Sequence, residues 1–225
     1  MDITFDGKVL RLKDVIIDAT GKTAQGMTIG EKGMTVLLEG DCKVKSDYAA
    51  LKIGQDANLV GNGTLTLEGG QYGILFDGNS FIVSQNDPIT LTIDGLTLTM
   101  QSGGAGFYGS GYGWATLVLN SADVTIESSS GAIYDIRGGV ELNNCYFAEP
   151  EDARMSIGSL YNRGSRATSA HIERGEDPDG IKEIKNEELR MKNEGVWYTI
   201  DGRKLSGKPS KAGLYIVGNR KVVIK

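Results

Sequence analysis

The chain has few of the residues from which soft-metal sites and disulfide frameworks are built. Its 225 residues include two cysteines and one histidine, and neither a CxxC nor an HExxH spacing occurs. Zinc sites and disulfide scaffolds need more of these residues at regular spacings. The sequence therefore predicts no metal site and no cofactor.

Long hydrophobic runs and an excess of positive charge are also missing. No apolar segment approaches the ~20 residues of a membrane-spanning helix. With 24 basic and 29 acidic residues the net charge is −5, which argues against nucleic-acid binding, since phosphate contacts need a basic face. Met1–Phe5 lacks the basic and apolar regions of a signal peptide, so the protein either stays inside the cell or has had such a peptide removed.

Proline is scarce with four residues, whereas glycine is abundant with 32. The glycine share is roughly twice the usual one, and no G-X-Y period is present, which excludes collagen. Hydrophobic residues make up 40% and charged residues 24%, as in a folded soluble protein. Abundant glycine without proline indicates many tight backbone corners.

An internal repeat with two landmarks organises residues 10–160. Each copy begins with a large aliphatic residue, and its fourth and fifth positions hold turn-forming pairs such as Asn62-Gly63, Asp94-Gly95 or Asn143-Asn144. A small residue followed by a large apolar one comes 14 to 20 residues later. The aliphatic anchors are Leu10, Leu37, Leu59, Leu91, Leu117 and Val140, and the second landmarks are Met27, Leu51, Ile74, Phe107, Ile133 and Leu160.

Consecutive anchors are 22 to 32 residues apart, a period typical of one coil of a parallel β-solenoid. A two-residue turn alone would equally fit antiparallel hairpins, but an antiparallel sandwich does not require two landmarks in phase. A leucine-rich repeat has a similar period, but its consensus pattern is absent from this sequence. The sequence therefore predicts an all-β fold, a single-stranded parallel β-helix of about six coils over residues 1–172.

The C-terminal part of the chain differs from the repeat. Residues 173–195 hold 13 charged residues among 23 and are predicted to form a linker. Residues 196–225 contain three or four short strands separated by turns such as Asp201-Gly202. So few residues cannot hold a self-sufficient core, and this small β module is expected to dock on something or be held by a partner.

Two resemblances accompany these patterns. Val196–Leu205, Lys211–Val217 and Lys221–Lys225 resemble the C-terminal module of secreted and surface proteins of Bacteroidetes, which acts as a sorting or anchoring signal in some members. This implies export to the extracellular space or the cell surface, with the signal peptide removed. The body resembles, more loosely, the right-handed β-helix of the pectate-lyase type, which hosts polysaccharide enzymes and adhesins.

The cysteines and the histidine are predicted to be structural. Cys42 and Cys145 lie four predicted coils apart, about 19 Å at the spacing between neighbouring strands, too far for a disulfide. We expect free, buried thiols that act as small hydrophobic side chains. His171 lies near the last predicted strand without an evident nucleophile or orienting partner, so surface or capping polarity is expected.

The segment from Phe107 to Trp114 packs four aromatic residues between glycines. Tyr108, Tyr112 and Trp114 carry polar tips on flat rings, which suits a half-wet platform for stacking sugar rings. In the alternative interpretation Phe107 belongs to the core and Trp114 covers a loop against the solenoid.

Asp135 and Arg137 form the most interesting charged pair, because an Asp-x-Arg pair on one strand face suits an anionic sugar. The alternative is an ordinary ion pair at the surface. The catalytic motifs of β-helical polygalacturonases and the aspartate cluster of calcium-dependent lyases are missing. No catalytic residue is assigned.

These observations lead us to expect a non-catalytic, exported cell-surface protein, either structural or carbohydrate-binding like an adhesin, with a glycan or the extracellular matrix as ligand. The alternatives are a small polysaccharide lyase or glycoside hydrolase that uses Asp135, and a spacer without a ligand. Open solenoid ends are exposed sheet edges, so residues 1–9 should cover one end and residues 165–225 the other, or copies should associate end to end.

Overall fold

The computed structural model describes residues 1–77, 88–110 and 114–177, and further along the chain 197–199, 203–205, 207, 209–217 and 220–224. The chain divides into two compact units, Met1–Pro178 and Asp179–Lys225. All regular elements among the described residues are β-strands. No helix long and apolar enough to cross a membrane occurs in this part of the chain.

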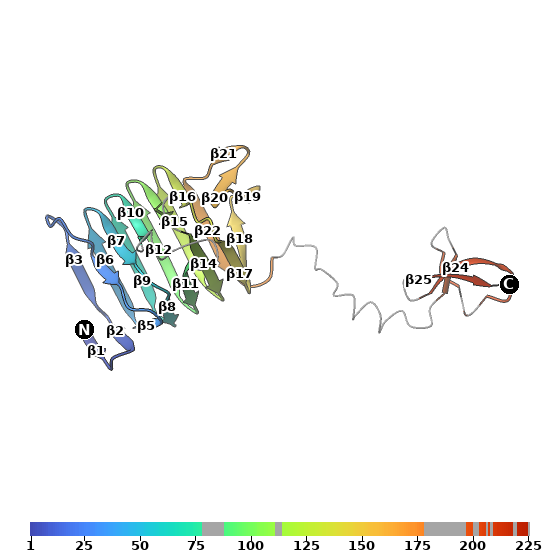
Figure 1. Ribbon diagram of the computed structural model, residues 1–225, viewed down its shortest axis with the longest axis horizontal. Coiled ribbons are helices and arrows are strands. Elements are labelled where there is room, and N and C mark those ends of the chain that lie inside the picture. The colour runs from blue at the N-terminus through green and yellow to red at the C-terminus, as the bar shows by residue number, and fades with distance from the viewer. Residues whose placement is uncertain are drawn as a thin grey trace. The chain divides into compact units, whose positions relative to one another are not determined.

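The first unit is a parallel β-solenoid (Figure 1), as predicted. Five successive coils each contribute one strand to each of three sheets. The first sheet holds β2 (Val9–Lys13), β5 (Met34–Glu39), β8 (Ala57–Gly61), β11 (Ile89–Asp94) and β14 (Ala115–Asn120). The second holds β3 (Ile16–Ala19), β6 (Asp41–Ser46), β9 (Thr64–Gly69), β12 (Thr97–Ser102) and β15 (Asp123–Ser128). The third holds β4 (Met27–Ile29), β7 (Ala49–Ile53), β10 (Tyr72–Phe76), β13 (Ala105–Gly109) and β16 (Gly131–Tyr134). The hand of the solenoid stays a prediction.

The sixth predicted coil is incomplete, so the prediction of about six coils overshoots by one. Its first strand, β17 (Gly139–Asn143), pairs in parallel with β14. Its second, β18 (Cys145–Glu149), does not reach β15, because β22 (Ser169–Arg174) lies between them and pairs antiparallel with both. The chain between β18 and β22 forms a separate antiparallel sheet of β19 (Ala153–Ser156), β20 (Ser159–Asn162) and β21 (Ser165–Arg166).

The second landmark of the repeat is confirmed in the five complete coils. Met27 pairs with Leu51, Leu51 with Ile74, and Ile74 with Phe107, and Phe107 pairs in turn with Ile133. These side chains point inward from the third sheet, and each packs on its copy in the next coil. Leu160 is also buried but lies in β20, outside this sheet.

The aliphatic anchors keep their register only in part. Leu91 and Leu117 pair directly, as predicted. Leu59 instead pairs with Ile93, two residues further along. Leu37 is half-buried on the outward side of β5, whereas both of its neighbours in the strand are fully buried. Its assignment as an inward anchor was therefore wrong by one position.

Corner length explains these shifts. Asp94 and Thr97 pair with Val60 and Thr64, respectively. Along the chain, two residues lie between Asp94 and Thr97, whereas three lie between Val60 and Thr64. The corner between the first and second sheets thus absorbs an extra residue in some coils, so a template of fixed spacing slips.

The core is one continuous column of inward aliphatic side chains, with Phe107 among the largest that are fully buried. Cys42 and Cys145 are free and buried, as predicted. Cys42 pairs with Leu65 of the next coil, and the Sγ of Cys145 lies 3.3 Å from the carbonyl oxygen of Leu119. Burial raises the pKa of the Cys145 thiol, which keeps it protonated and unreactive.

The two ends of the solenoid are covered differently. β1 (Asp2–Phe5) pairs antiparallel with β2 and adds one strand to the first sheet only. Ile3 and Phe5 stay 53% and 58% exposed, so the first nine residues cover an edge rather than the whole end. At the other end, β22 places Ala170 and Ile172 in the core, which agrees with the predicted cover by residues after 165.

The second unit contains an antiparallel sheet of β23 (Trp197–Thr199), β24 (Gly213–Val217) and β25 (Arg220–Ile224). The Trp197 and Tyr215 rings lie edge to face with centroids 6.5 Å apart. Residues 178–195 of the predicted linker lie outside the described residues, and Glu173 and Arg174 belong to β22. The predicted domain boundaries and the role of this module as a sorting signal stay predictions.

Candidate functional site

Four tyrosines from successive coils form a row on the third sheet and the corner that precedes it. Tyr48 and Tyr72 meet edge to face with ring centroids 5.5 Å apart. Tyr72 and Tyr108 are stacked, with centroids 4.5 Å apart and planes 6° apart. Tyr108 and Tyr134 follow at 5.4 Å. We call these four residues the tyrosine row.

Two of the tyrosines share one position in their coils, and the other two reach the row from earlier positions. Tyr108 and Tyr134 are direct partners in β13 and β16. Tyr72 opens β10 and pairs with Ala105, three residues before Tyr108. Burial, and to a lesser extent the neighbouring tyrosines, raise the pKa of the Tyr72 phenol, which therefore stays neutral at physiological pH.

A groove of about 290 Å³ runs beside three of the tyrosines. Its described lining residues carry no charge; they are Gln71, Tyr72, Gly103, Gly104, Ala105, Tyr108, Ser130 and Tyr134. A Cβ atom on Gly103 or Gly104 would meet the backbone oxygen of the coil before, at Gly70 or Gln71. The absence of side chains lets these corners stack closely and leaves the groove floor bare.

A second and larger groove, of about 540 Å³, lies on the second-sheet side of the same corner, and Gly103 lines both grooves. Its lining is polar and includes Lys45, Glu68, Gln101 and Glu127 from four successive coils. Sequence reasoning missed this groove. The signal was present in the alternation of β6 and β9, which turns polar residues outward at every second position.

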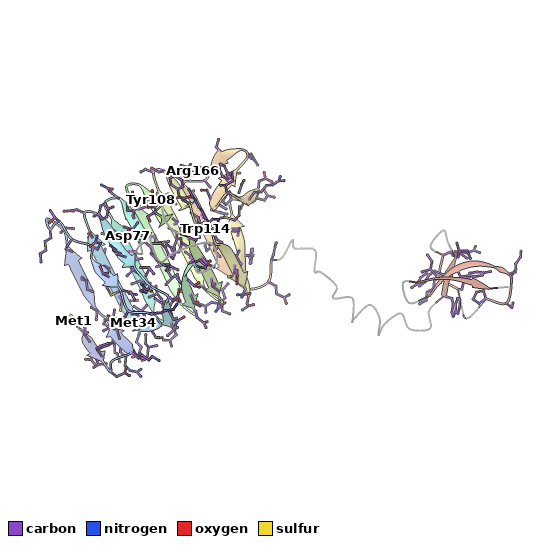
Figure 2. All side chains as sticks on the ribbon, viewed as in Figure 1. Met1, Met34, Asp77, Tyr108, Trp114 and Arg166 are labelled. Atoms are coloured by element: carbon purple, nitrogen blue, oxygen red, sulfur yellow. The ribbon has the colours of Figure 1, made fainter. Side chains whose placement is uncertain are left out.

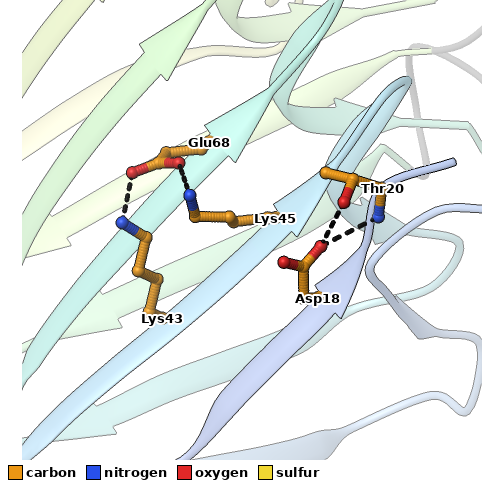
Figure 3. Close-up of polar contacts among 5 residues, drawn as sticks. All are labelled: Asp18, Thr20, Lys43, Lys45 and Glu68. Atoms are coloured by element: carbon orange, nitrogen blue, oxygen red, sulfur yellow. Dashed lines mark hydrogen bonds and ion pairs between the residues drawn. The ribbon is translucent and has the colours of Figure 1, made fainter.

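Two lysines hold the carboxylate of Glu68 in this polar groove (Figure 3). Lys43 Nζ pairs with Glu68 Oε1, and Lys45 Nζ lies 2.7 Å from Glu68 Oε2. The Asp18 carboxylate nearby accepts hydrogen bonds from the Thr20 hydroxyl at 2.6 Å and the Thr20 N–H at 3.0 Å. Hydrogen bonds from Lys43 and Lys45 lower the pKa of Glu68, the opposite of what a general acid requires.

The Glu68→Gln variant should be less stable than the wild type at pH 7 by up to about 1 kcal/mol. The folded pKa of Glu68 lies below its ordinary value of 4.5, so the ion pairs stabilise the fold above that value, and this contribution is lost as the pH falls through the folded pKa. Urea unfolding should show a smaller difference in the free energy of unfolding between wild type and Glu68→Gln at pH 3 than at pH 7. Glu127→Gln, at an exposed position of the same row, is the control; equal losses in both variants at both pH values would contradict the prediction.

The structure separates the residues of the predicted aromatic platform. Tyr108 belongs to the tyrosine row, and Tyr112 lies outside the described residues. Trp114 is half-buried and packs against the core, as the alternative interpretation expected. Tyr108, Trp114 and Arg166 are labelled in Figure 2. Sequence reasoning missed the other three tyrosines of the row. Tyr134 follows Ile133 as Tyr108 follows Phe107, and this shared position was a signal in the repeat, whereas Tyr48 and Tyr72 lie at other positions.

Asp135 and Arg137 form an ion pair with each other. Arg137 Nε lies 2.6 Å from Asp135 Oδ1. Asp135 adopts a left-handed backbone, with φ of 61°, and its N–H donates to the Ser159 hydroxyl at 3.1 Å. Neither residue lines the tyrosine groove, so the pair terminates β16 rather than facing that site.

The remaining ionisable groups form no metal site within the described ranges. No three His, Cys, Asp or Glu side chains come together there in a geometry that could hold a metal ion. The Nε2 of His171 lies 3.5 Å from Asp123 Oδ1, with both side chains 35% exposed. This pair links the cap strand β22 to β15, in line with the expected capping role of His171.

Comparisons of the chain with protein-family models, with curated proteins and with solved structures gave no significant match.

Proposed function

We propose that this protein is a non-catalytic, exported cell-surface protein that binds an extended glycan along the tyrosine row. The observation that carries the proposal is the row itself, four rings from four successive coils, three of which line a groove whose described lining residues are uncharged. A tyrosine side chain combines an apolar ring with a polar tip, which suits contact with the mixed apolar and polar surface of a sugar chain.

The direction of the row favours a polymer over a single sugar. Successive tyrosines come from successive coils, so the row follows the solenoid axis with the spacing of neighbouring strands. An extended chain of pyranose rings advances along its length in steps of similar size. The glycine corner leaves the floor of the groove open to close approach, and Gln71 and Ser130 supply hydrogen-bonding groups along it.

Export and surface attachment belong to the same proposal. They are supported by the likeness of residues 196–225 to the C-terminal sorting or anchoring module of secreted Bacteroidetes proteins. The solenoid would be a right-handed β-helix of the pectate-lyase type that presents its binding surface away from the cell. A glycan of a host or of the extracellular matrix is the expected partner.

Tyr108→Ala should weaken binding to a glycan by about two- to tenfold, because the variant loses the contacts of one aromatic ring, and aromatic contacts contribute on the order of 0.5–1.5 kcal/mol. Tyr108→Phe keeps the ring and should retain binding within about twofold. A glycan array should first find the ligand, and affinity electrophoresis in gels that contain it should then compare the variants. An array without any bound glycan, or unchanged binding by a folded Tyr108→Ala variant, would refute the proposal.

A further inference from the structure

The small antiparallel sheet beyond the last complete coil, together with its turns, carries three arginines, and one of them, Arg166, contacts the tyrosine row. Arg154 in β19 is the direct partner of Tyr161 in β20, and Tyr161 is the partner of Arg166 in β21. Directly opposed residues of neighbouring strands lie on the same side of a sheet. One side of this sheet therefore presents an arginine, a tyrosine and a second arginine in a line.

Arg166 connects this line with the tyrosine row. Its guanidinium carbon lies 3.7 Å from the centroid of the Tyr134 ring, which is a cation–π contact. Its Nη1 donates to the Ser130 carbonyl oxygen at 3.3 Å, and both Ser130 and Tyr134 line the tyrosine groove. Within the described residues its buried Nε has no hydrogen-bond partner. The tyrosine groove thus ends at a cation.

A hollow of about 310 Å³ lies on the antiparallel sheet, and Asp152, Arg154, Tyr161, Arg163 and Gly164 line it. Arg163 Nε lies 3.0 Å from Asp152 Oδ2, and the two side chains are 78% and 54% exposed. Such an exposed pair is weak and occupies one of the five N–H donors of the guanidinium. Two arginines face one carboxylate in this hollow, in a chain whose net charge is −5.

We infer that the Arg154–Arg163 hollow and Arg166 form an oxyanion-binding end of the tyrosine groove, and that the glycan carries sulfate esters or carboxylates. This inference rests on the proposed glycan binding. The planar fork of an arginine matches the paired oxygens of either group. The tyrosines hold the sugar rings, and the arginines select chains whose substituents are negatively charged.

The experiment compares three polymers, dextran sulfate, hyaluronan and unmodified dextran, by biolayer interferometry of the full-length protein at fixed salt. Wild-type protein should bind at least one anionic polymer about fivefold or more tighter than dextran, and the two anionic polymers distinguish sulfate from carboxylate. The double variant Arg154→Gln, Arg163→Gln should lose about five- to tenfold in that affinity and keep its affinity for dextran. Arg11→Gln, Lys13→Gln removes the same charge from exposed positions of β2 and should change neither affinity.

The outcomes separate the two claims. Equal binding of all three polymers by the wild type, or an anionic preference that survives in the arginine variant, overturns this inference and leaves glycan binding intact. Equal losses in the β2 control variant also overturn it, because they show attraction to overall charge. If the protein binds none of the three polymers and no glycan on the array, both the oxyanion inference and the proposed glycan binding are overturned. Tyr108→Ala should weaken binding to anionic and neutral polymers alike.

Discussion

Replacing Phe107 with alanine should lower the free energy of unfolding of the solenoid by about 3–5 kcal/mol. Phe107 is fully buried and lies in the inward stack between Ile74 and Ile133. The flanking strands are held at a fixed spacing by their backbone hydrogen bonds. The neighbouring coils therefore cannot collapse into the space that the ring leaves, and the cavity contributes its full cost.

Denaturant unfolding of the full chain, followed by circular dichroism, measures this effect. Ile74→Val removes one methylene from the same stack and should cost only about 0.5–1.5 kcal/mol, so it is the matched control. Each coil of a solenoid is stabilised mainly by its neighbours. Phe107→Ala should therefore also broaden the unfolding transition if the coils on either side of the cavity unfold separately. A loss below about 1 kcal/mol for Phe107→Ala would show that the column is not packed as described.

The stack that contains Phe107 was also the most predictable part of the fold. A small residue followed by a large one recurs in every complete coil, because the inward position of the third sheet meets its own copy above and below. The first sheet was less predictable. Its corner to the second sheet varies in length, so the spacing that placed Leu37 inward slipped by one residue, although the fold class did not depend on it.

The direction of the cap strand β22 could not be read from the sequence, although a last strand near His171 was predicted. Ala170 and Ile172 are buried and alternate with exposed residues, a pattern that fits a parallel or an antiparallel strand equally well. Only the position of the chain decides that β22 returns along β15 and displaces the sixth coil. The same return carries Arg166 to the ring of Tyr134, so the arginines of the hollow gave no sequence signal as a group.

Only one residue of the tyrosine row was predicted from the sequence. Tyr108 stood out because it lies in an aromatic segment, whereas Tyr48, Tyr72 and Tyr134 are scattered through three other coils. Tyr134 is the direct strand partner of Tyr108. Tyr48 and Tyr72 lie several residues before the strand position of Tyr108, and the length of their side chains brings the rings together. A repeat template aligns Cα positions and cannot show contacts that long side chains make across them.

Gly69→Ala should lower the free energy of unfolding by about 3 kcal/mol and weaken glycan binding as well. Gly69 ends β9 and is buried, and a Cβ atom there would overlap the backbone oxygen of Tyr72 and come within 3.3 Å of the Ala50 nitrogen. Overpacking of this kind costs about 1–3 kcal/mol. The obstacle is backbone and cannot turn away, which places the effect at the upper end of this range.

The same displacement would move Tyr72, whose ring stacks on Tyr108 at 4.5 Å. Gly30→Ala is the matched control, because Gly30 is exposed and a Cβ atom there meets nothing within 4 Å; it should change the stability by no more than about 0.5 kcal/mol. Thermal unfolding and affinity electrophoresis of both variants test the coupling. We expect the close backbone contact at Gly69 to fix the position at which Tyr72 begins its strand. A stable Gly69→Ala variant with normal glycan binding would therefore show that this corner does not position the tyrosine row.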